Sequence, residues 1–194
     1  CVGFTKMVCK MSRIIKKSAK VSENVFLIGM MGSGKTSLGK ILAQKLGKVF
    51  CDTDLVLEER TGVKVSVIFD IEGEEGFRAR ESALLDQLTR TSGIVMATGG
   101  GVILKKENVK VLRERGVVVF LRAAVSDIVT RTMHDKDRPL LQAENREERI
   151  LEIYKQREEK YLSSAHVVVD TDDGNLAAIA SGLGQFLERE KFLI

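Results

Sequence analysis

The stretch that most constrains this sequence is 25–38, which reads VFLIGMMGSGKTSL. A short apolar run of strand-forming residues, Val25–Ile28, leads into GMMGSGKT, and apolar residues at helical spacing follow directly. This spacing of glycines, Lys35 and Thr36 between a strand and a helix is typical of a phosphate-binding loop. Glycines allow backbone N–H groups to turn inward around a polyphosphate, and the start of the helix adds the positive end of its dipole. The stretch therefore predicts binding of a nucleoside triphosphate.

Within this loop the residue types suggest separate roles. The Lys35 ammonium is expected to reach the β and γ phosphates, and the Thr36 hydroxyl to ligate Mg²⁺. The remaining nucleotide contacts are expected from neighbouring residues of the loop and the first helical turn, namely Gly32, Ser33, Gly34 and Ser37.

Length and composition favour one soluble domain. The 194 residues are 44% hydrophobic, which is enough for a core of ordinary domain size. No apolar run approaches the roughly 18 residues of a membrane span, and no signal peptide is recognisable. The three cysteines have no metal-type spacing and the two histidines are far apart, which argues against a zinc site and for reduced thiols. We therefore expect a cytoplasmic protein that binds no membrane.

The basic residues are concentrated at the N-terminus. Residues 1–22 carry six basic side chains and no acidic one, so a chain of net charge +4 leaves −2 for residues 23–194. We interpret 1–22 as a disordered, solvated extension and 23–194 as a single domain. A nucleic-acid-binding arm or a remnant of a targeting peptide is the alternative for the extension.

The rest of the chain alternates between strand and helix patterns. Further strands are expected at 49–51, 94–97, 117–121 and 166–170, separated by connections of helical length. This alternation predicts an α/β fold of three layers, with a central five-stranded parallel sheet flanked by helices. Asp52 and Asp54, two apart on an extended segment, are expected to point the same way. A helix is expected to start at Ser126, which is a good N-cap.

Three further features lie where a ligand would bind. The phosphate loop, Asp52–Asp54 and Gly99–Gly101 each follow a strand, and the carboxyl edge of a parallel sheet is where such folds bind ligands. On a helix predicted from about Glu74 to Thr91, Arg78 and Glu81 are three apart and so adjacent. The charged segment 134–141, HDKDRPLL, is expected to form an exposed flap.

Together these motifs resemble the shikimate kinase family over about residues 24–188. The resemblance is carried by GMMGSGKT (29–36), DTD (52–54), IFDIEGEEGFRARE (68–81), ATGGG (97–101), DRPLL (137–141) and an arginine four residues before a tyrosine, Arg157 and Tyr161. It implies ATP-dependent phosphorylation of the 3-hydroxyl of shikimate with Mg²⁺, in aromatic amino-acid biosynthesis. It also implies a monomer that binds no nucleic acid. It also implies a mobile lid at about 134–145.

The resemblance implies a role for each matching residue. Asp52 lies near the Mg²⁺ ligated by Thr36, while Asp54 binds ring hydroxyls and accepts the proton of the attacking hydroxyl. Lys35 and the lid arginine, Arg138, act on the ATP phosphates. The acceptor carboxylate is held by Arg78 and Arg157, and a backbone contact comes from Gly100, with Glu81, Gly99 and Gly101 in support. The adenine is placed near Arg131 and about Asp172–Asn175.

Several alternatives remain from the residues alone. The two aspartates could cap a helix, and the three arginines could be solvated surface residues. Asp70–Gly73 mimics a GTPase element, although the sequence contains no guanine-reading NKxD. A kinase for gluconate or a nucleoside monophosphate, or an inactive relative that only binds nucleotide, would share most of these features.

Overall fold

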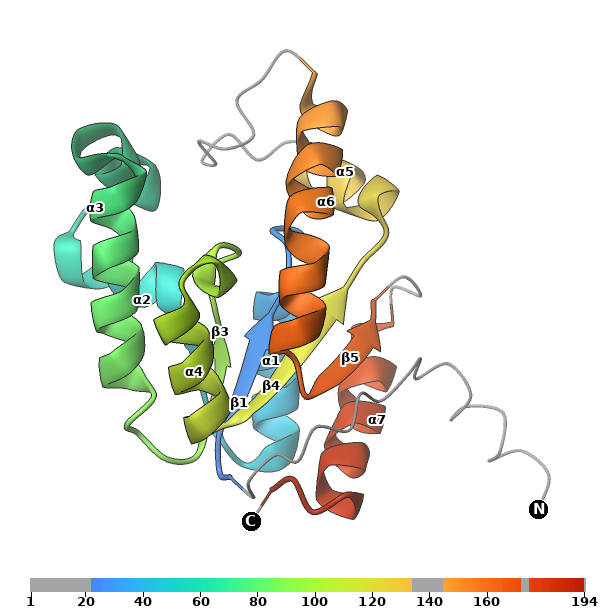
Figure 1. The fold of residues 1–194 in the computed structure, drawn as a ribbon. Helices are drawn as coiled ribbons and strands as arrows, with labels where there is room; N and C mark the ends of the chain where they lie inside the picture. The colour runs from blue at the N-terminus through green and yellow to red at the C-terminus, as the bar shows by residue number, and fades with distance from the viewer. Residues whose placement is uncertain (1–21, 134–144, 172–174, 194) are drawn as a thin grey trace.

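The computed structural model describes residues 22–133, 145–171 and 175–193. Five strands form one parallel sheet: β1 (Val25–Ile28), β2 (Val49–Asp52), β3 (Ile94–Ala97), β4 (Val117–Arg122) and β5 (Val167–Asp170). Their order across the sheet is β2-β3-β1-β4-β5, so β1 lies at the centre between β3 and β4 (Figure 1). The predicted α/β architecture and its five strands are confirmed.

Helices cover both faces of this sheet. On one face α1 (Lys35–Leu46) packs beside α7 (Leu176–Arg189), and on the other lie α4 (Lys106–Arg115) and α6 (Arg146–Ser164) (Figure 1). The alternation of side chains along β1 explains the two cores. Val25 and Leu27 join the cluster under α1 and α7, whereas Phe26 and Ile28 join the cluster under α4 and α6.

The remaining elements project from the carboxyl edge or flank the sheet. These are α2 (Thr53–Thr61), α3 (Val65–Leu88), the short 3₁₀ helix η1 (Val102–Leu104) and α5 (Val125–Thr132). In α3, Gly73 has φ 69° and ψ −176°, which breaks the helix into two segments. The helix predicted from about Glu74 is therefore confirmed as the second segment of α3, which ends at Leu88. The break falls at a glycine because only glycine adopts these angles readily.

Two local predictions were wrong. Helix α5 begins at Val125 with Ala124 at the N-cap, so Ser126 lies inside the helix and does not cap it. Asp54 is not on an extended segment, because α2 begins at Thr53, directly after β2. Local spacing could not locate either boundary, since both depend on where the strand meets the sheet edge.

Several predicted features lie wholly or partly outside the described residues. Residues 1–21 and the segment 134–144, which holds most of the expected lid, lie outside the described residues, as do 172–174 of the expected adenine loop. Ser22, counted with the N-terminal extension, is described, and its backbone N–H donates to Phe192 O over 3.0 Å. Within the described ranges, no helix combines the length and apolar character that crossing a bilayer requires.

Candidate active site

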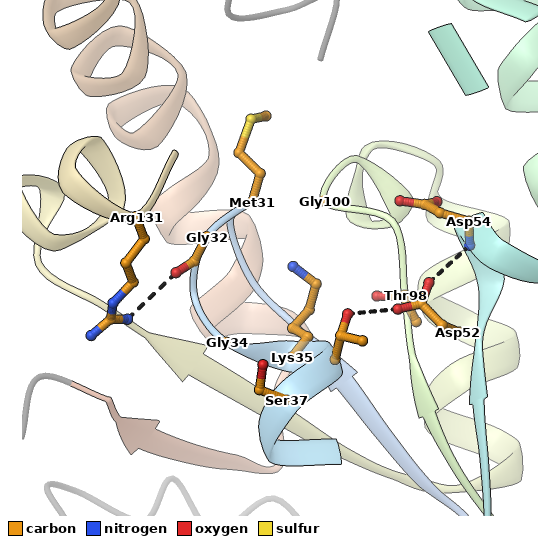
Figure 2. Close-up of a pocket in the computed structure, with 11 residues that line it drawn as sticks. Met31, Gly32, Gly34, Lys35, Ser37, Asp52, Asp54, Thr98, Gly100 and Arg131 are labelled. Carbon is orange, nitrogen blue, oxygen red and sulfur yellow. Dashed lines mark hydrogen bonds between the residues drawn. The ribbon is translucent and has the colours of Figure 1, made fainter. Parts of the chain in front are cut away.

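A pocket of about 340 Å³ lies at the carboxyl edge of the sheet (Figure 2). Residues from the ends of β1, β2 and β3 and from α5 meet there, although they are up to 100 positions apart in sequence. The lining residues are Met31, Gly32, Gly34, Lys35, Thr36, Ser37, Asp52, Asp54, Thr98, Gly100 and Arg131. The topology thus brings the three predicted strand-end motifs into one site.

The phosphate loop connects β1 to α1 at the floor of this pocket. Gly34 caps α1 with φ 91°, a left-handed conformation that directs the chain into the helix. Lys35 Nζ donates to the carbonyls of Gly29 and Met30 over 2.9 and 2.8 Å. The ammonium therefore lies across the loop, close to where its backbone N–H groups would receive phosphate oxygens. Ser33 is fully buried, and its Oγ has no hydrogen-bond partner among the described residues.

Asp52 joins the phosphate loop to α2. Its Oδ2 accepts a hydrogen bond from Thr36 Oγ1 over 2.6 Å, and its Oδ1 accepts one from Asp54 N over 3.1 Å (Figure 2). Asp52 is therefore the N-cap of α2, which agrees with the alternative that the aspartates cap a helix. The same carboxylate also orients the hydroxyl of Thr36. Because the Thr36 proton is directed at Asp52, the oxygen lone pairs remain available for a cation.

Two of the three glycines after β3 leave space for charged side chains. A Cβ on Gly99 would lie 2.4 Å from Glu81 Oε1 and 3.1 Å from Asp54 Oδ1. A Cβ on Gly101 would overlap the guanidinium of Arg78, with Nη2 at 2.1 Å. Glycine is needed at both positions because these side chains occupy the space that a Cβ would take.

Arg78 and Glu81 form a buried ion pair, with Nη1 and Oε2 2.8 Å apart. Arg78 also contacts Glu74, and its guanidinium lies 5.1 Å from the centroid of the Phe77 ring. Burial raises the pKa of the Glu81 carboxyl, and the charge of Arg78 acts in the opposite direction. Burial would lower the pKa of Arg78, but the two glutamates raise it, so the guanidinium stays charged. The pair is buried, unlike the solvated surface pair considered from spacing alone.

The second predicted arginine, Arg157, reaches the same region from α6. It is buried, and its Nη1 donates to Gly100 O over 3.4 Å. Tyr161, one turn later on α6, donates its hydroxyl proton to the same carbonyl. The sequence marked this tyrosine only as part of a motif. Its position four residues after Arg157 was the available signal, because residues at this spacing share one face of a helix.

Arg131 borders the other side of the pocket. Its Nη1 donates to Gly32 O over 3.4 Å (Figure 2). Its Nη2 donates to Thr171 O over 3.0 Å. The side chain thus ties α5 to the phosphate loop and to the chain that leaves β5. Arg138, predicted to act on the phosphates, lies outside the described residues.

Two further features of the sequence do not line the pocket. Asp70–Gly73, which mimics a GTPase element, belongs to α3 and does not line the pocket. His166 is buried directly before β5 and accepts a hydrogen bond from Val118 N over 3.0 Å, in keeping with a structural role. Among the described residues, no group of three or more His, Cys, Asp or Glu side chains could hold a metal ion alone.

A parallel sheet in this order, with a phosphate loop after its central strand and buried cations beside the pocket, defines a P-loop kinase of small molecules. The sequence matches the family model described as shikimate kinase over residues 31–188. The chain belongs to the shikimate kinase family.

Individual relatives agree with this assignment. The chain is 47% identical over 165 residues to a shikimate kinase of Vibrio parahaemolyticus, covering 85% of this chain and 96% of the relative. A solved shikimate kinase from Acinetobacter baumannii, in complex with shikimate, superposes with a TM-score of 0.85 at 40% identity. That match covers 88% of this chain and 95% of the other. A gluconokinase from Sinorhizobium meliloti, with a TM-score of 0.51 at 17% identity and coverage of 89% and 98%, shares the fold alone.

Proposed function

We propose that this protein transfers the γ-phosphoryl group of ATP to the 3-hydroxyl of shikimate, giving shikimate 3-phosphate and ADP for aromatic biosynthesis. Membership of the family supports the reaction and ATP as the phosphoryl donor. The observation that carries the choice of acceptor is the pair of buried arginines, Arg78 and Arg157, beside the phosphate-loop pocket. Two such cations suit a small carboxylic acid, because a guanidinium binds a carboxylate with two parallel hydrogen bonds.

On the acceptor side, we assign carboxylate binding to Arg78 and Arg157. Glu81 and Glu74 orient the Arg78 fork, and the Gly100 backbone contacts the substrate. Asp54 lines the pocket on the first turn of α2, which suits contact with ring hydroxyls. The attacking oxygen bonds to the γ-phosphorus as the bond from that phosphorus to the ADP oxygen breaks. The proton of the attacking hydroxyl passes to the Asp54 carboxylate.

On the nucleotide side, the loop from Gly32 to Ser37 holds the polyphosphate and Lys35 balances charge at the β and γ positions. Lys35 exchanges its contacts with the Gly29 and Met30 carbonyls for phosphate oxygens. Arg138 is assigned to the same phosphates from its sequence position. This arrangement supplies positioning and electrostatic stabilisation, which are what a loose phosphoryl transfer requires from a protein.

The residues present also fit Mg²⁺. Thr36 Oγ1 and the Asp52 carboxylate are the oxygen ligands that this cation prefers, and it commonly completes its octahedron with phosphate oxygens and water. Thr36 would bind the cation directly and Asp52 would orient Thr36 and nearby water. When bound, the cation neutralises charge that develops on the phosphate oxygens.

The test is ADP release with ATP and Mg²⁺ in the presence of shikimate, gluconate, a nucleoside monophosphate or no acceptor. We expect turnover that depends on shikimate. Arg78→Ala should lower kcat/KM for shikimate by about 30-fold or more, since loss of one partner of a buried charge pair costs about 2–5 kcal/mol. Arg80→Ala is the matched control, because Arg80 lies two residues away on α3 but is exposed. Turnover that prefers another acceptor, or equal effects of the two variants, would contradict the proposal.

We also propose that the protein acts as a monomer in the cytoplasm. Every residue assigned above belongs to one chain, so one chain suffices for the site. Light scattering combined with size-exclusion chromatography would check the mass, and an active species of twice 21.5 kDa would contradict it.

A further inference from the structure

Tyr161 is held rigidly between the hydrophobic core and the active site. The residue is fully buried, and its ring stacks on Phe120 of β4 with centroids 4.9 Å apart and planes at 14°. Both rings belong to the core cluster under α4 and α6. Stacking and burial leave the ring little freedom, so its hydroxyl is presented at a defined point at the end of β3.

At that point two donors meet one acceptor. The Gly100 carbonyl accepts from Tyr161 Oη in a short hydrogen bond and from Arg157 Nη1 over 3.4 Å. The second distance is near the outer limit for a hydrogen bond, so the tyrosine is the principal partner of this carbonyl. The buried Arg157 guanidinium also hydrogen-bonds with the Tyr161 hydroxyl and lies near the charge of Glu81.

We propose that Tyr161 is a positioning residue for the acceptor: by satisfying the Gly100 carbonyl, it leaves the Arg157 guanidinium available for the carboxylate of the substrate. This inference rests on the proposed function, because it assumes an acceptor that carries a carboxylate. It goes beyond that function by assigning a role to a residue that does not contact the substrate.

The effect of removing the hydroxyl follows from hydrogen-bond accounting. Without it, the half-buried Gly100 carbonyl would keep only its long contact to Arg157 unless a donor moves closer, and a poorly satisfied acceptor away from water is costly. Arg157, already within 3.4 Å, is the nearest such donor. Its guanidinium would be drawn to the carbonyl and would no longer present both N–H groups to the acceptor.

The two tyrosines of the chain provide a matched pair of variants. Tyr154 lies on the same helix and donates to Glu158 Oε1 over 2.9 Å, and it is not among the residues assigned to the site. Tyr161→Phe should raise KM for shikimate about tenfold, with kcat and KM for ATP changed less than about twofold, because only binding of a remote group is weakened. Tyr154→Phe should leave all three constants unchanged.

A double-mutant cycle separates positioning from general structure. In the Arg157→Ala background, Tyr161→Phe should have no further effect on KM, since the residue it positions is absent. If Tyr161 serves only the core, Tyr161→Phe should instead lower thermal stability by the same amount in both backgrounds. Its effect on KM should then add to the effect of Arg157→Ala. Additive effects on KM would overturn the proposal.

A spectroscopic test does not depend on folding of Tyr161→Phe. The chain has no tryptophan, so in Tyr154→Phe the near-ultraviolet tyrosine absorbance comes from Tyr161 alone. Shikimate should perturb that absorbance as Arg157 turns from the Tyr161 and Gly100 oxygens to the carboxylate, and gluconate should not. A silent Tyr161 under saturating shikimate, or an unchanged KM in Tyr161→Phe, would overturn the inference alone. Absence of shikimate-dependent turnover in the wild type would overturn the proposed function and this inference together.

Discussion

At the scale of single residues, the site depends on close approach between charged side chains and the backbone. The GGG run after β3 attracts attention in the sequence as a place where the backbone meets a ligand. In the structure, Gly101 lies against the Arg78 guanidinium and Gly99 lies beside Glu81 and Asp54. These two glycines thus leave the space in which the charged side chains of Arg78 and Glu81 lie.

Gly101→Ala should displace Arg78, because the new methyl carbon would lie 2.1 Å from Nη2. We expect KM for shikimate to rise by about tenfold or more, equivalent to about 1.4 kcal/mol, while nucleotide binding is retained. Steady-state kinetics with each substrate varied would measure this. Gly184→Ala on α7 is the control, since its Cβ would meet only ordinary contacts at 3.6 and 3.8 Å. Equal kinetics for the two variants would show that Arg78 tolerates the methyl group.

His166 should make stability depend on pH. Burial, with a smaller effect from Arg113, lowers the pKa of His166 to about 4. The unfolded chain, with an ordinary histidine pKa near 6.5, therefore binds more protons between these values. The contribution of neutral His166 to the free energy of unfolding is therefore complete above about pH 6.5 and is lost as the pH falls through 4. After allowance for solvent screening, the loss is about 2 kcal/mol.

Urea unfolding at a series of pH values would measure this loss. His166→Asn should flatten the dependence, because the amide oxygen can accept from Val118 N but does not titrate in this range. The same slope in both proteins would assign the pH dependence to other groups.

At the scale of elements, each functional residue depends on where a strand ends and the next helix begins. Gly34 starts α1, Asp52 caps α2, and the break at Gly73 separates the first segment of α3 from the segment that carries Arg78 and Glu81. The end of β2 is the clearest case. One carboxylate both starts a helix and aligns the threonine of the phosphate loop.

Asp52→Asn should separate these two tasks. Asparagine is as good an N-cap as aspartate, so α2 and the free energy of unfolding should change little. The charge near Thr36 is lost, and we expect the Mg²⁺ concentration for half-maximal activity to rise about tenfold. Asp52→Ala, which loses the cap as well, should in addition lower stability by about 1 kcal/mol. Magnesium titrations and thermal unfolding of both variants measure the two effects, and an unchanged Mg²⁺ requirement in Asp52→Asn would remove Asp52 from the cation site.

At the scale of the whole molecule, the two sides that we propose for nucleotide and for acceptor are built from different parts of the chain. The phosphate loop and α5 supply one side, while α2, α3, the end of β3 and α6 supply the other. Helices α2 and α3 also share a small core of their own, formed by Leu57, Ile68, Phe77 and Leu84. Damage to one side should therefore leave the other able to bind its ligand.

Ligand-induced stabilisation should show this division. A ligand at about 100 times its Kd stabilises a protein by about 2.7 kcal/mol, which corresponds to roughly 5–10 °C in Tm for a chain of this size. Mg-ATP and shikimate should each raise Tm of the wild type. Arg78→Ala should keep the nucleotide shift and lose most of the shikimate shift, as differential scanning fluorimetry would show. Loss of both shifts would mean that the variant disturbs the whole pocket.

The sequence by itself determined the fold class, the strands to within a residue or two, and the phosphate loop, because these depend on local periodicity and on glycine spacing. It also supplied the identity of the candidate residues and, through Arg78 and Glu81, a correct neighbour pair on one helix.

Only the tertiary structure decided the strand order, which brings Gly29–Thr36, Asp52–Asp54 and Gly99–Gly101 to one pocket. It likewise decided the helical position of Asp54, the burial of Arg78 and Arg157, and the hydrogen bond from Tyr161 to the Gly100 carbonyl. Burial and contacts between residues distant in sequence depend on packing around the whole sheet, and spacing along the chain carries no record of that packing.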